Sequence, residues 1–375
     1  VSTGDMDNDG YDELVIGAMA IDHDGQMLWV KDGRDGRDFQ GHSDSIHLSA
    51  MNPQDPTQLY VFTPSEEVEA TLNGTLSNAE NGSRINGTFA APADIGRGVA
   101  ANITPRPGFE YWINKPGNEG GADGAIYNFD GTVLASVPPE KMSTNWRIYW
   151  DGDLLSELGD GRNNGAGGTD WKIYEYNWET NELDDVETMW GTHTNNSTKN
   201  NPSLTADLFG DWREEVIVPS ADDSELRVYM TGYETEYMIY SLMQDPVYRN
   251  AVANQNTAYN QPPHLGFYLG EDNRDQVLGR SLPTPNIRYT AGERRELEVE
   301  VEADEGKVTG KYETILAGAN GEAIKAAIKA EAGIDIGSGA DLLAYMKSKV
   351  AADSEPVLGM LPENQRVALN IQLTM

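Results

Sequence analysis

Leu204-Thr-Ala-Asp-Leu-Phe-Gly-Asp-Trp-Arg-Glu-Glu-Val216 joins a short apolar run to a turn rich in carboxylates and then to a second apolar run. A similar turn lies near the beginning of the sequence, in Gly4-Asp-Met-Asp-Asn-Asp-Gly-Tyr-Asp-Glu-Leu-Val15. Degraded versions occur near residues 50 and 102. A motif that returns along a chain indicates a repeated structural unit. The sequence therefore predicts several copies of one β-rich element, with functional loops between them.

Short β-like segments separated by tight turns accompany these motifs. Ala20–Trp29 holds two apolar runs on either side of Asp24-Gly25, a strong hairpin signal, and Ala125–Leu134 repeats the pattern. A third version lies at Trp171–Trp178. The repetition predicts an all-β fold in which four-stranded sheets form the blades of a β-propeller. A plain β-sandwich is the alternative, but it does not explain the regular return of one motif.

Length and composition are those of a globular protein. The 375 residues include 38% hydrophobic and 23% charged side chains, enough for one large core or two ordinary ones. Aspartate and glutamate outnumber lysine and arginine by 61 to 27, and the formal net charge of -34 argues against nucleic acid as a partner. No apolar run approaches the roughly 18 to 20 residues that span a bilayer. The absence of cysteine excludes disulfides and thiolate metal sites.

The first acidic turn has the spacing of a calcium loop. Carboxylates at alternate positions supply hard oxygen ligands, and a glycine permits the sharp bend that such a loop requires. Without a cation, these oxygens would repel one another. The sequence predicts a structural calcium ion here, and a bare polar turn is the alternative. The predicted ligands are the side chains of Asp5, Asp7, Asp9 and Glu13 and the backbone carbonyl of Tyr11.

The turn that follows Leu204 predicts a weaker or vacant calcium site. Phe209 stands where the second carboxylate of the first turn lies, whereas Asp207, Asp211 and Glu215 are kept. We expect all these turns to stabilise the structure rather than to take part in catalysis.

The pattern of charged and apolar residues changes after about residue 280. Charged and apolar residues alternate over Arg294–Val301 and again over Val367–Leu373, and helix-like patterns lie between them at Glu322–Ala330 and Ala340–Val350. The predicted domains are residues 1–288, which form the β-domain, and residues 289–375, which form a small α+β module of unknown role.

Two segments hold candidate functional residues. In Gly41-His-Ser-Asp-Ser-Ile-His47, a strand-like segment would direct His42 and Asp44 to the same side. Together with Glu66 they offer ligands for a metal ion or contacts for an acidic sugar, and a structural histidine is the alternative. Arg97 lies between two glycines, where a ligand can approach the backbone, and its guanidinium suits a carboxylate. A surface salt bridge is the alternative for Arg97.

Several long sequence segments resemble those of a known family. They are Gly41-His-Ser-Asp44, Ile95-Gly-Arg-Gly98, Ser143-Thr-Asn145, Tyr149-Trp-Asp-Gly-Asp-Leu-Leu155, Asn195-Asn-Ser-Thr-Lys199, Ala206-Asp-Leu-Phe-Gly-Asp-Trp-Arg-Glu-Glu-Val216, Leu242-Met-Gln-Asp-Pro-Val-Tyr-Arg249 and Asn256-Thr-Ala-Tyr-Asn-Gln-Pro-Pro-His264. In this order they resemble the rhamnogalacturonan lyases of polysaccharide lyase family 11. The resemblance covers roughly residues 1–288 and does not rest on any single motif.

The resemblance implies an eight-bladed β-propeller with bound calcium, which cleaves the rhamnose–galacturonate bond of the pectin backbone by β-elimination. Removal of the uronate C5 proton builds charge at the carboxylate, where a cation and an arginine stabilise the transition state. By position, His42, Asp44 and Glu66 resemble ligands of the active-site calcium. Lys199 resembles the base and Arg97 the charge neutraliser, although the two roles can be reversed.

The resemblance also implies a sugar-binding edge and identifies an acidic plant cell-wall polysaccharide as the partner and Ca²⁺ as the cofactor. Tyr259 is a further candidate to take part in proton transfer. The residues that match the sugar-binding edge are Asn196, Ser197, Thr198, Asn256, Ala258 and Tyr259.

The sequence departs from the family pattern at several points. Ser197 replaces a glycine, and Ser65 and Gln244 replace histidines. A histidine that the family places before the position of Val1, as a further calcium ligand, is absent, and so are the first blades. About half of a propeller is present, so we expect a truncated form with impaired activity that needs its N-terminal blades or another chain to close. The first residues lack a signal peptide, so the family alone implies a secreted protein.

The sequence is compatible with three functions. The first is a lyase, and the second is a calcium-stabilised propeller that binds pectin without cleaving it. The third is an adhesion protein with integrin-like calcium repeats, but this reading leaves the loops that contain His42 and Lys199 unexplained.

Overall fold

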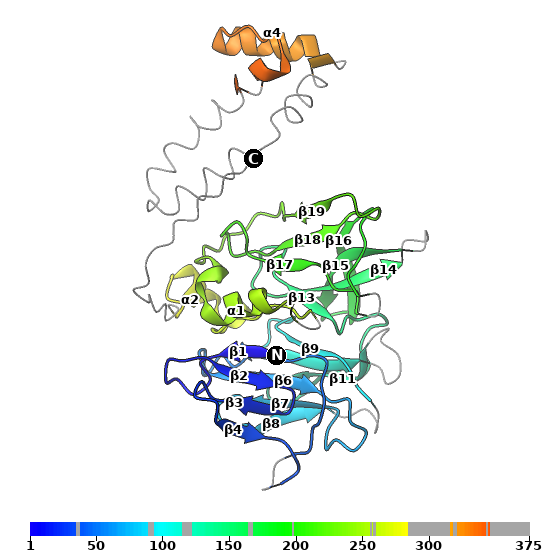
Figure 1. Ribbon diagram of the computed structural model, residues 1–375, viewed down its shortest axis with the longest axis vertical. Helices are drawn as coiled ribbons and strands as arrows, with labels where there is room; N and C mark the ends of the chain where they lie inside the picture. Colours follow the sequence, from blue (N-terminus) through cyan, green and yellow to red (C-terminus); the bar gives the residue numbers. More distant parts are fainter. Residues whose placement is uncertain are drawn as a thin grey trace. The chain divides into compact units, whose positions relative to one another are not determined.

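The computed structural model divides into two units, Val1–Tyr289 and Thr290–Met375. The first unit is mostly antiparallel β-sheet (Figure 1), in agreement with the all-β prediction. Within the residues described below, no helix is long and apolar enough to cross a membrane. The structure describes residues 1–34, 38–88, 94–114, 122–163, 168–196, 199–255, 257, 260–283, 316–317, 321–342 and 344–345.

Consecutive strands form antiparallel sheets along the first unit. Neighbours in the sequence are also neighbours in each sheet, because short turns are sufficient to join antiparallel strands. The first three sheets contain β1 (Ser2–Gly4), β2 (Glu13–Ile16), β3 (Met19–Ile21) and β4 (Met27–Val30); β5 (His47–Ala50), β6 (Leu59–Pro64), β7 (Gly74–Asn78) and β8 (Arg84–Thr88); and β9 (Gly98–Ala101), β10 (Glu110–Asn114), β11 (Ala122–Asn128) and β12 (Val133–Ala135).

Two further sheets complete the described β-structure. The hairpins expected at residues 20–29 and 125–134 are present as β3–β4 and β11–β12, and Gly25 and Gly131 adopt φ of 85° and 84° in their turns. The fourth and fifth sheets contain β13 (Trp146–Ile148), β14 (Glu157–Asn163), β15 (Thr169–Asn177) and β16 (Glu182–Met189); and β17 (Leu204–Ala206), β18 (Glu215–Pro219) and β19 (Leu226–Tyr229).

Helices follow the last sheet. Helix α1 (Pro246–Asn254) begins after Asp245, whose carboxylate accepts the Val247 N–H at 3.1 Å. This helix contacts both β1 of the first sheet and β17 of the last (Figure 1). The shorter helices are η1 (Leu242–Gln244), η2 (Glu271–Asn273) and α2 (Arg274–Leu278).

Each sheet packs against the next one through its own apolar cluster. The side chains in these clusters are buried, so each contact between sheets is a small hydrophobic core. Pairs that represent the successive contacts are Val15 with Val61, Phe62 with Tyr111, Ile126 with Tyr174, and Ile173 with Val216.

A buried glutamate closes the turn between the first two strands in four of these sheets. Its carboxylate accepts the backbone N–H seven residues earlier, so the acidic motif fixes the hairpin whether or not a cation is present. The bonds are Met6 N to Glu13 Oε2 at 2.6 Å, Ile103 N to Glu110 Oε2 at 3.0 Å, Trp150 N to Glu157 Oε2 at 2.6 Å and Leu208 N to Glu215 Oε2 at 2.7 Å. In the second sheet, Leu59 stands at the corresponding register position, opposite Ala50, and the hydroxyl of the next residue, Tyr60, accepts from Asn52 Nδ2 at 3.3 Å.

The second unit contains a small helical core. The helix expected over residues 322–330 is present as α4 (Gly321–Ala332). Residues 339–342 and 344–345 are also helical and overlap the helix expected over 340–350. The strands expected at 294–301 and 367–373 lie outside the described residues. The core consists of Leu316, Ile328, Ile336, Leu342 and Tyr345.

Candidate active site

Several candidate residues meet at Asp44. Lys199 Nζ lies 3.2 Å from Asp44 Oδ2, and Arg97 Nη1 donates to the Asp44 carbonyl at 3.2 Å. His42, Asp44 and Glu66 each offer one ligand atom, and these atoms lie within 4.8 Å of one another. Four segments that are distant in the sequence therefore converge at one point.

The segment around His42 is a loop that leads into β5, so the expected strand-like alternation is wrong here. Ser43 Oγ donates to the Ser45 carbonyl at 2.7 Å, which bends the chain between the two candidate ligands. His42 is exposed and its Nδ1 contacts Glu66 Oε2, whereas Asp44 is buried. The side chains of His42 and Asp44 therefore come together because the backbone turns between them, and not because they lie on the same face of a strand.

Arg97 is buried, with 1% of its surface exposed, which excludes the alternative of a surface salt bridge. Its Nε donates to Asn145 Oδ1 at 3.2 Å, and its Nη2 donates to the carbonyls of Asn145 and Asn260 at 3.1 and 3.2 Å. Asn145 therefore fixes the plane of the guanidinium. From the sequence, Asn145 was identified only as part of the segment Ser143-Thr-Asn145, because the sequence does not indicate which residue an amide side chain will bind.

Lys199 is held by a turn made of asparagines. The N–H groups of Lys199 and Asn200 both donate to the Asn196 carbonyl, at 2.9 and 2.8 Å. Asn196 and Asn200 adopt φ of 51° and 50°, a left-handed conformation that asparagine tolerates better than most residues. The amide-rich composition of this loop thus has a backbone reason, and the turn directs Lys199 toward Asp44.

Gly96 leaves space at the centre of the cluster. A Cβ atom added there would lie 2.9 Å from Glu66 Oε1, 3.5 Å from Asp44 Oδ2 and 3.8 Å from Lys199 Nζ. A cavity of about 480 Å³ opens beside the cluster, lined in part by His42 and Asp44. Any side chain at position 96 would occupy the space that a cation or a substrate carboxylate needs.

The carboxylates of this cluster are crowded. Burial raises the pKa of Glu66, the charges of Asp44 and Asp94 raise it further, and the contact with His42 lowers it. A divalent cation between the carboxylates would remove this repulsion, so their oxygens fit calcium. The imidazole nitrogen of His42 is a less usual ligand for that ion.

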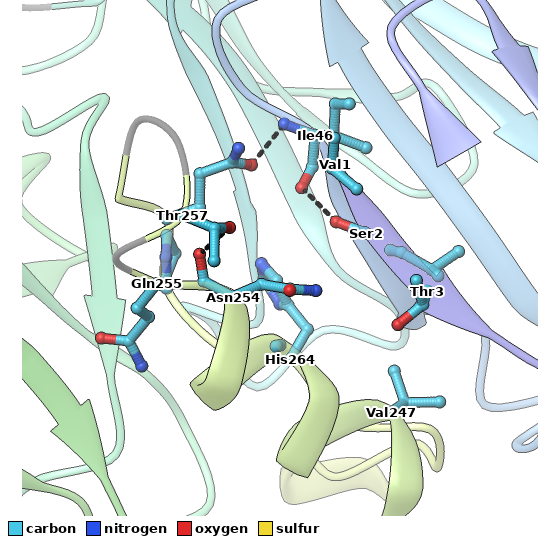
Figure 2. A pocket seen from close by; sticks show the side chains of 13 residues that line it. Val1, Ser2, Thr3, Ile46, Val247, Asn254, Gln255, Thr257 and His264 are labelled. Atoms are coloured by element: carbon cyan, nitrogen blue, oxygen red, sulfur yellow. Dashed lines mark hydrogen bonds between the residues drawn. The ribbon is translucent and has the colours of Figure 1, made fainter. Parts of the chain in front are cut away.

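The segment after α1 is tied to the start of β5 (Figure 2). Gln261 Oε1 accepts from Ile46 N at 2.6 Å, and Ser2 Oγ donates to the Ile46 carbonyl at 3.2 Å. The bond from Ile46 to Gln261 holds the segment that supplies the Asn260 carbonyl to Arg97, and the bond from Ser2 joins β1 to the same Ile46. Five predicted residues of the sugar-binding edge lie outside the described residues: Ser197, Thr198, Asn256, Ala258 and Tyr259.

A buried histidine pair lies beneath Arg97. His47 Nε2 donates to the Gly98 carbonyl at 2.7 Å, so its Nδ1 accepts from His264 Nε2 at 2.8 Å. Burial lowers the pKa of His47 to about 3 and the pKa of His264 well below its usual value. Both imidazoles are therefore neutral and serve to support the strand that follows Arg97.

The first acidic turn brings its predicted ligands together. Asp5, Asp7 and Glu13 offer ligand atoms within 4.8 Å of one another, and Asp9, Glu13 and His23 do the same. Glu13 is buried, and its Oε1 has no hydrogen-bond partner. His23 was not predicted from the sequence; its ring stacks on Tyr11 with centroids 4.5 Å apart.

A matched glutamate shows what the first turn lacks. Burial raises the pKa of Glu13 to about 7, with further raising by the charges of Asp7 and Asp5. In the third sheet, the corresponding Glu110 has both oxygens satisfied, because Thr104 Oγ1 donates to Oε1 at 2.6 Å. Glu13 Oε1 has no hydrogen-bond donor and lies 3.8 Å from His23 Nδ1, so it marks a place that fits a cation.

The turn in the fifth sheet is arranged differently. Asp211 Oδ2 pairs with Arg213 Nη2 at 2.6 Å, and both oxygens of Asp207 accept backbone N–H groups, from Gly210 and Leu242 at 2.7 Å. Among the described residues, the groups that could share one metal ion do not include Asp207, Asp211 and Glu215.

The fourth sheet contains an acidic group that sequence reasoning missed. Asp151, Asp153 and Glu157 offer ligand atoms within 4.8 Å of one another. Burial raises the pKa of Asp153 to about 7, and the charge of Asp151 raises it further. The signal was present in the sequence, since these residues repeat the spacing of Asp7, Asp9 and Glu13.

Comparison with known proteins identifies the family. Residues 1–277 match the family model described as rhamnogalacturonan lyase family 11, C-terminal domain. The chain is 39% identical over 291 residues to rhamnogalacturonan endolyase YesW of Bacillus subtilis, covering 77% of this chain and 41% of that protein. It is 40% identical over 298 residues to rhamnogalacturonan exolyase YesX of the same organism, covering 79% and 45%.

Solved structures agree with these matches. The crystal structure of rhamnogalacturonan lyase YesW aligns with a TM-score of 0.63 at 40% identity, over 72% of this chain and 42% of that chain. The Bacillus licheniformis rhamnogalacturonan lyase PL11 aligns with a TM-score of 0.64 at 39% identity, over 77% and 44%. The chain spans less than half the length of these relatives. It belongs to rhamnogalacturonan lyase family 11.

Proposed function

We propose that the chain carries the positively charged catalytic side chains of a rhamnogalacturonan lyase. We propose further that the whole protein cleaves the rhamnose–galacturonate bond of pectin rhamnogalacturonan I. The observation that supports this proposal is the convergence of Lys199 and Arg97 on Asp44, beside a cavity. Two buried cations in a chain of net charge -34 suit an acidic sugar. Both named Bacillus subtilis relatives are rhamnogalacturonan lyases.

In the proposed β-elimination, Arg97 supplies fixed positive charge beside the uronate carboxylate while the proton leaves C5. Lys199 Nζ, as the neutral amine, accepts this proton. The electrons of the C5–H bond form the C4=C5 double bond, the C4–O bond breaks, and the departing sugar carries the oxygen away and is protonated. Asn145 acts through Arg97, since it fixes the orientation of the guanidinium.

His42, Asp44 and Glu66 would hold the calcium ion of the active site. When bound, calcium supplies a further positive charge to the substrate carboxylate. Asp44 neutralises the Lys199 ammonium in the present arrangement. If Asp44 also serves as a metal ligand, its pairing with Lys199 weakens, which favours the neutral amine that a base requires.

We further propose that the first acidic turn binds a structural calcium ion through Asp5, Asp7, Asp9, Glu13 and the Tyr11 carbonyl. The buried oxygen of Glu13 that receives no hydrogen bond supports this assignment. For Asp207, Asp211 and Glu215 a calcium ion would first have to displace Arg213 from Asp211.

We also propose that the sheets are blades of a β-propeller in a secreted protein. Successive packing of the sheets in chain order supports the propeller. Because the chain spans less than half of its relatives, we propose that N-terminal blades or another chain complete the ring. A substrate in the plant cell wall implies an extracellular protein.

One observation favours the alternative of a pectin-binding propeller without activity. Only 5% of the Lys199 surface and 1% of the Arg97 surface are exposed, and the Lys199 ammonium has a carboxylate partner. A covered and paired lysine is a poor base until this pairing is broken.

The experiment incubates the protein with rhamnogalacturonan I and calcium and follows the ultraviolet absorbance of the unsaturated uronate product. We expect product from the whole protein with its N-terminal blades in place and from a Lys325→Ala control in α4 of that protein, and none from Lys199→Ala. Absence of product from every variant, with polymer binding retained, would replace the lyase with the binding protein. Equal rates for Lys199→Ala and wild type would refute the assigned base.

A further inference from the structure

A second groove lies on one face of the fourth sheet. Its volume is about 390 Å³, within the range of roughly 300–1,000 Å³ that is usual for ligand sites. Asp160 pairs with Lys172 and Arg162 with Asp170 across β14 and β15, so these four side chains share a face. The loop residues Glu140 and Lys141 also line the groove.

Trp190 provides an exposed aromatic surface at the rim of this groove. It follows β16 and keeps 72% of its surface exposed, more than any other large hydrophobic residue of the described chain. An indole is largely apolar, so its exposure leaves unfavourable contact with water that a ligand can remove. The apolar face of a pyranose ring is a suitable partner for such a flat surface.

Among the described residues, two of the cations that line the groove are not in ion pairs with its carboxylates. Lys172 Nζ pairs with Asp185 Oδ1 at 2.5 Å, and Asp170 Oδ1 accepts the Gly191 and Thr192 N–H groups at 3.0 and 3.2 Å. Within the described residues, neither Arg162 nor Lys141 forms an ion pair. Glu140 and Asp170 also line the groove, and the buried Asp160 interacts electrostatically with Arg162. The two cations therefore lie near carboxylates without being held in an ion pair, and they can still bind the carboxylate of a ligand.

Arg162 is already held in place for a ligand. Its guanidinium carbon lies 4.8 Å from the centroid of the Tyr174 ring, and its Nη2 donates to the Lys141 carbonyl at 3.0 Å. Since stacking and one hydrogen bond fix the plane of the guanidinium, an incoming carboxylate meets donors whose conformational freedom is already reduced.

The groove begins close to the candidate active site. Gly161, next to Arg162, packs against the side chain of Asn200, and a Cβ atom added to it would lie 2.7 Å from Asn200 Cγ. Asn200 directly follows Lys199. Neighbouring residues of the chain therefore connect the groove with the candidate active site.

We propose that the groove between Trp190, Arg162 and Lys141 is a second carbohydrate site, which takes a uronate-bearing segment of an acidic polysaccharide. One sugar ring lies on the Trp190 indole, and a carboxylate of the segment binds Arg162 and Lys141. The site deepens the proposed function and rests on it only for the identity of the polymer, since the binding contacts do not include Lys199.

The first test compares two probes that differ at C6 of each sugar, trigalacturonate with carboxylates and galactotriose with hydroxymethyl groups. Binding is followed by NMR through the indole N–H resonance of Trp190 and by calorimetry. We expect trigalacturonate to shift this resonance and galactotriose to bind at least tenfold more weakly. Trp190→Ala should lower the affinity at least tenfold and Lys141→Gln about threefold, whereas Trp178→Ala, a partly exposed tryptophan outside the groove, should bind like wild type. Equal affinity of Trp190→Ala and wild type, or equal binding of both probes, would overturn the site.

The second test separates this site from the proposed reaction. With rhamnogalacturonan I as substrate, Trp190→Ala should raise KM for the long polymer and leave kcat unchanged. Cleavage that depends on Lys199 but has the same KM in Trp190→Ala would reject the groove and leave the lyase intact. Trigalacturonate binding that depends on Trp190, without cleavage by any variant, would reject the lyase and leave the groove intact.

Discussion

The Lys199 ammonium lies 3.2 Å from the Asp44 carboxylate, and only 6% and 7% of the two side chains are exposed. Removal of one partner from such a buried pair leaves an uncompensated charge, which costs about 3–5 kcal/mol. The pair therefore links the stability of two loops to the charge state that the proposed chemistry needs.

A double-mutant cycle tests this link. We expect Asp44→Asn and Lys199→Met each to lower the free energy of unfolding by a few kcal/mol, and the double variant to lose clearly less than the sum. Urea denaturation in the absence of calcium measures the four values. Additive losses would show that the two side chains do not interact in solution.

Gly96→Ala tests the space at the centre of the cluster. The added methyl group lies 2.9 Å from Glu66 Oε1, so we expect calcium affinity and the rate of rhamnogalacturonan cleavage to fall at least tenfold, or about 1.4 kcal/mol. Calorimetry measures the first quantity and product absorbance the second. Gly232→Ala is the matched control, because a Cβ atom at Gly232 meets nothing within 4 Å. Unchanged calcium binding in Gly96→Ala would remove this site from the proposal.

Calcium should stabilise the first sheet through its acidic turn. A ligand that binds only the folded state at 100 times its dissociation constant contributes about 2.7 kcal/mol. We expect calcium to raise the melting temperature of the wild-type protein, and Asp7→Asn to lose part of this shift. Asp130→Asn, in the β11–β12 turn, should keep the full shift. An equal response of Asp7→Asn and wild type would argue against this calcium site.

The buried Glu110 should make the protein less stable as the pH rises from about 4.5 to about 8. Burial raises its pKa to about 8 from the usual 4.5, so the folded state keeps a proton that the unfolded chain releases. The contribution of Glu110 to stability is therefore complete below about pH 4.5 and decreases up to about pH 8, by roughly 1.4 kcal/mol per pH unit.

Glu110→Gln removes this titration and keeps the hydrogen bonds, because an amide can accept from Ile103 N and donate to Thr104 Oγ1. We expect the variant to gain stability relative to wild type between pH 5 and pH 8, measured by urea denaturation at both values. The same difference at both pH values would mean that Glu110 does not bind the extra proton.

The sequence predicted the repeated units because its signals are local. Carboxylate spacing and the Asp24-Gly25 turn act within a few residues, so the acidic turns and the β3–β4 hairpin were found at their observed places. The strand-like reading of His42 and Asp44 failed because alternation over three residues does not distinguish a strand from a turn. The acidic group at Asp151 was missed although its spacing is readable.

Contacts between distant segments were not predictable from pattern alone. The bonds from Arg97 to Asn145 and Asn260 join residues that are 48 and 163 positions apart, and the Trp190 groove depends on the register of three strands. The resemblance to the family identified both Arg97 and Lys199 as catalytic candidates. The structure adds their shared partner Asp44 and the glycine at the centre of the cluster, Gly96.

The glutamate that closes each acidic turn uses backbone N–H groups, so the hairpin does not depend on an ion. Glu110 closes its turn with Thr104 as partner, whereas Glu13 does so among carboxylates. Ion dependence is therefore a separable property of each sheet, adjustable by exchanging the side chains around one fixed carboxylate. Protein engineers can use this modularity to make single sheets of such a fold respond to calcium or ignore it, without altering strand register.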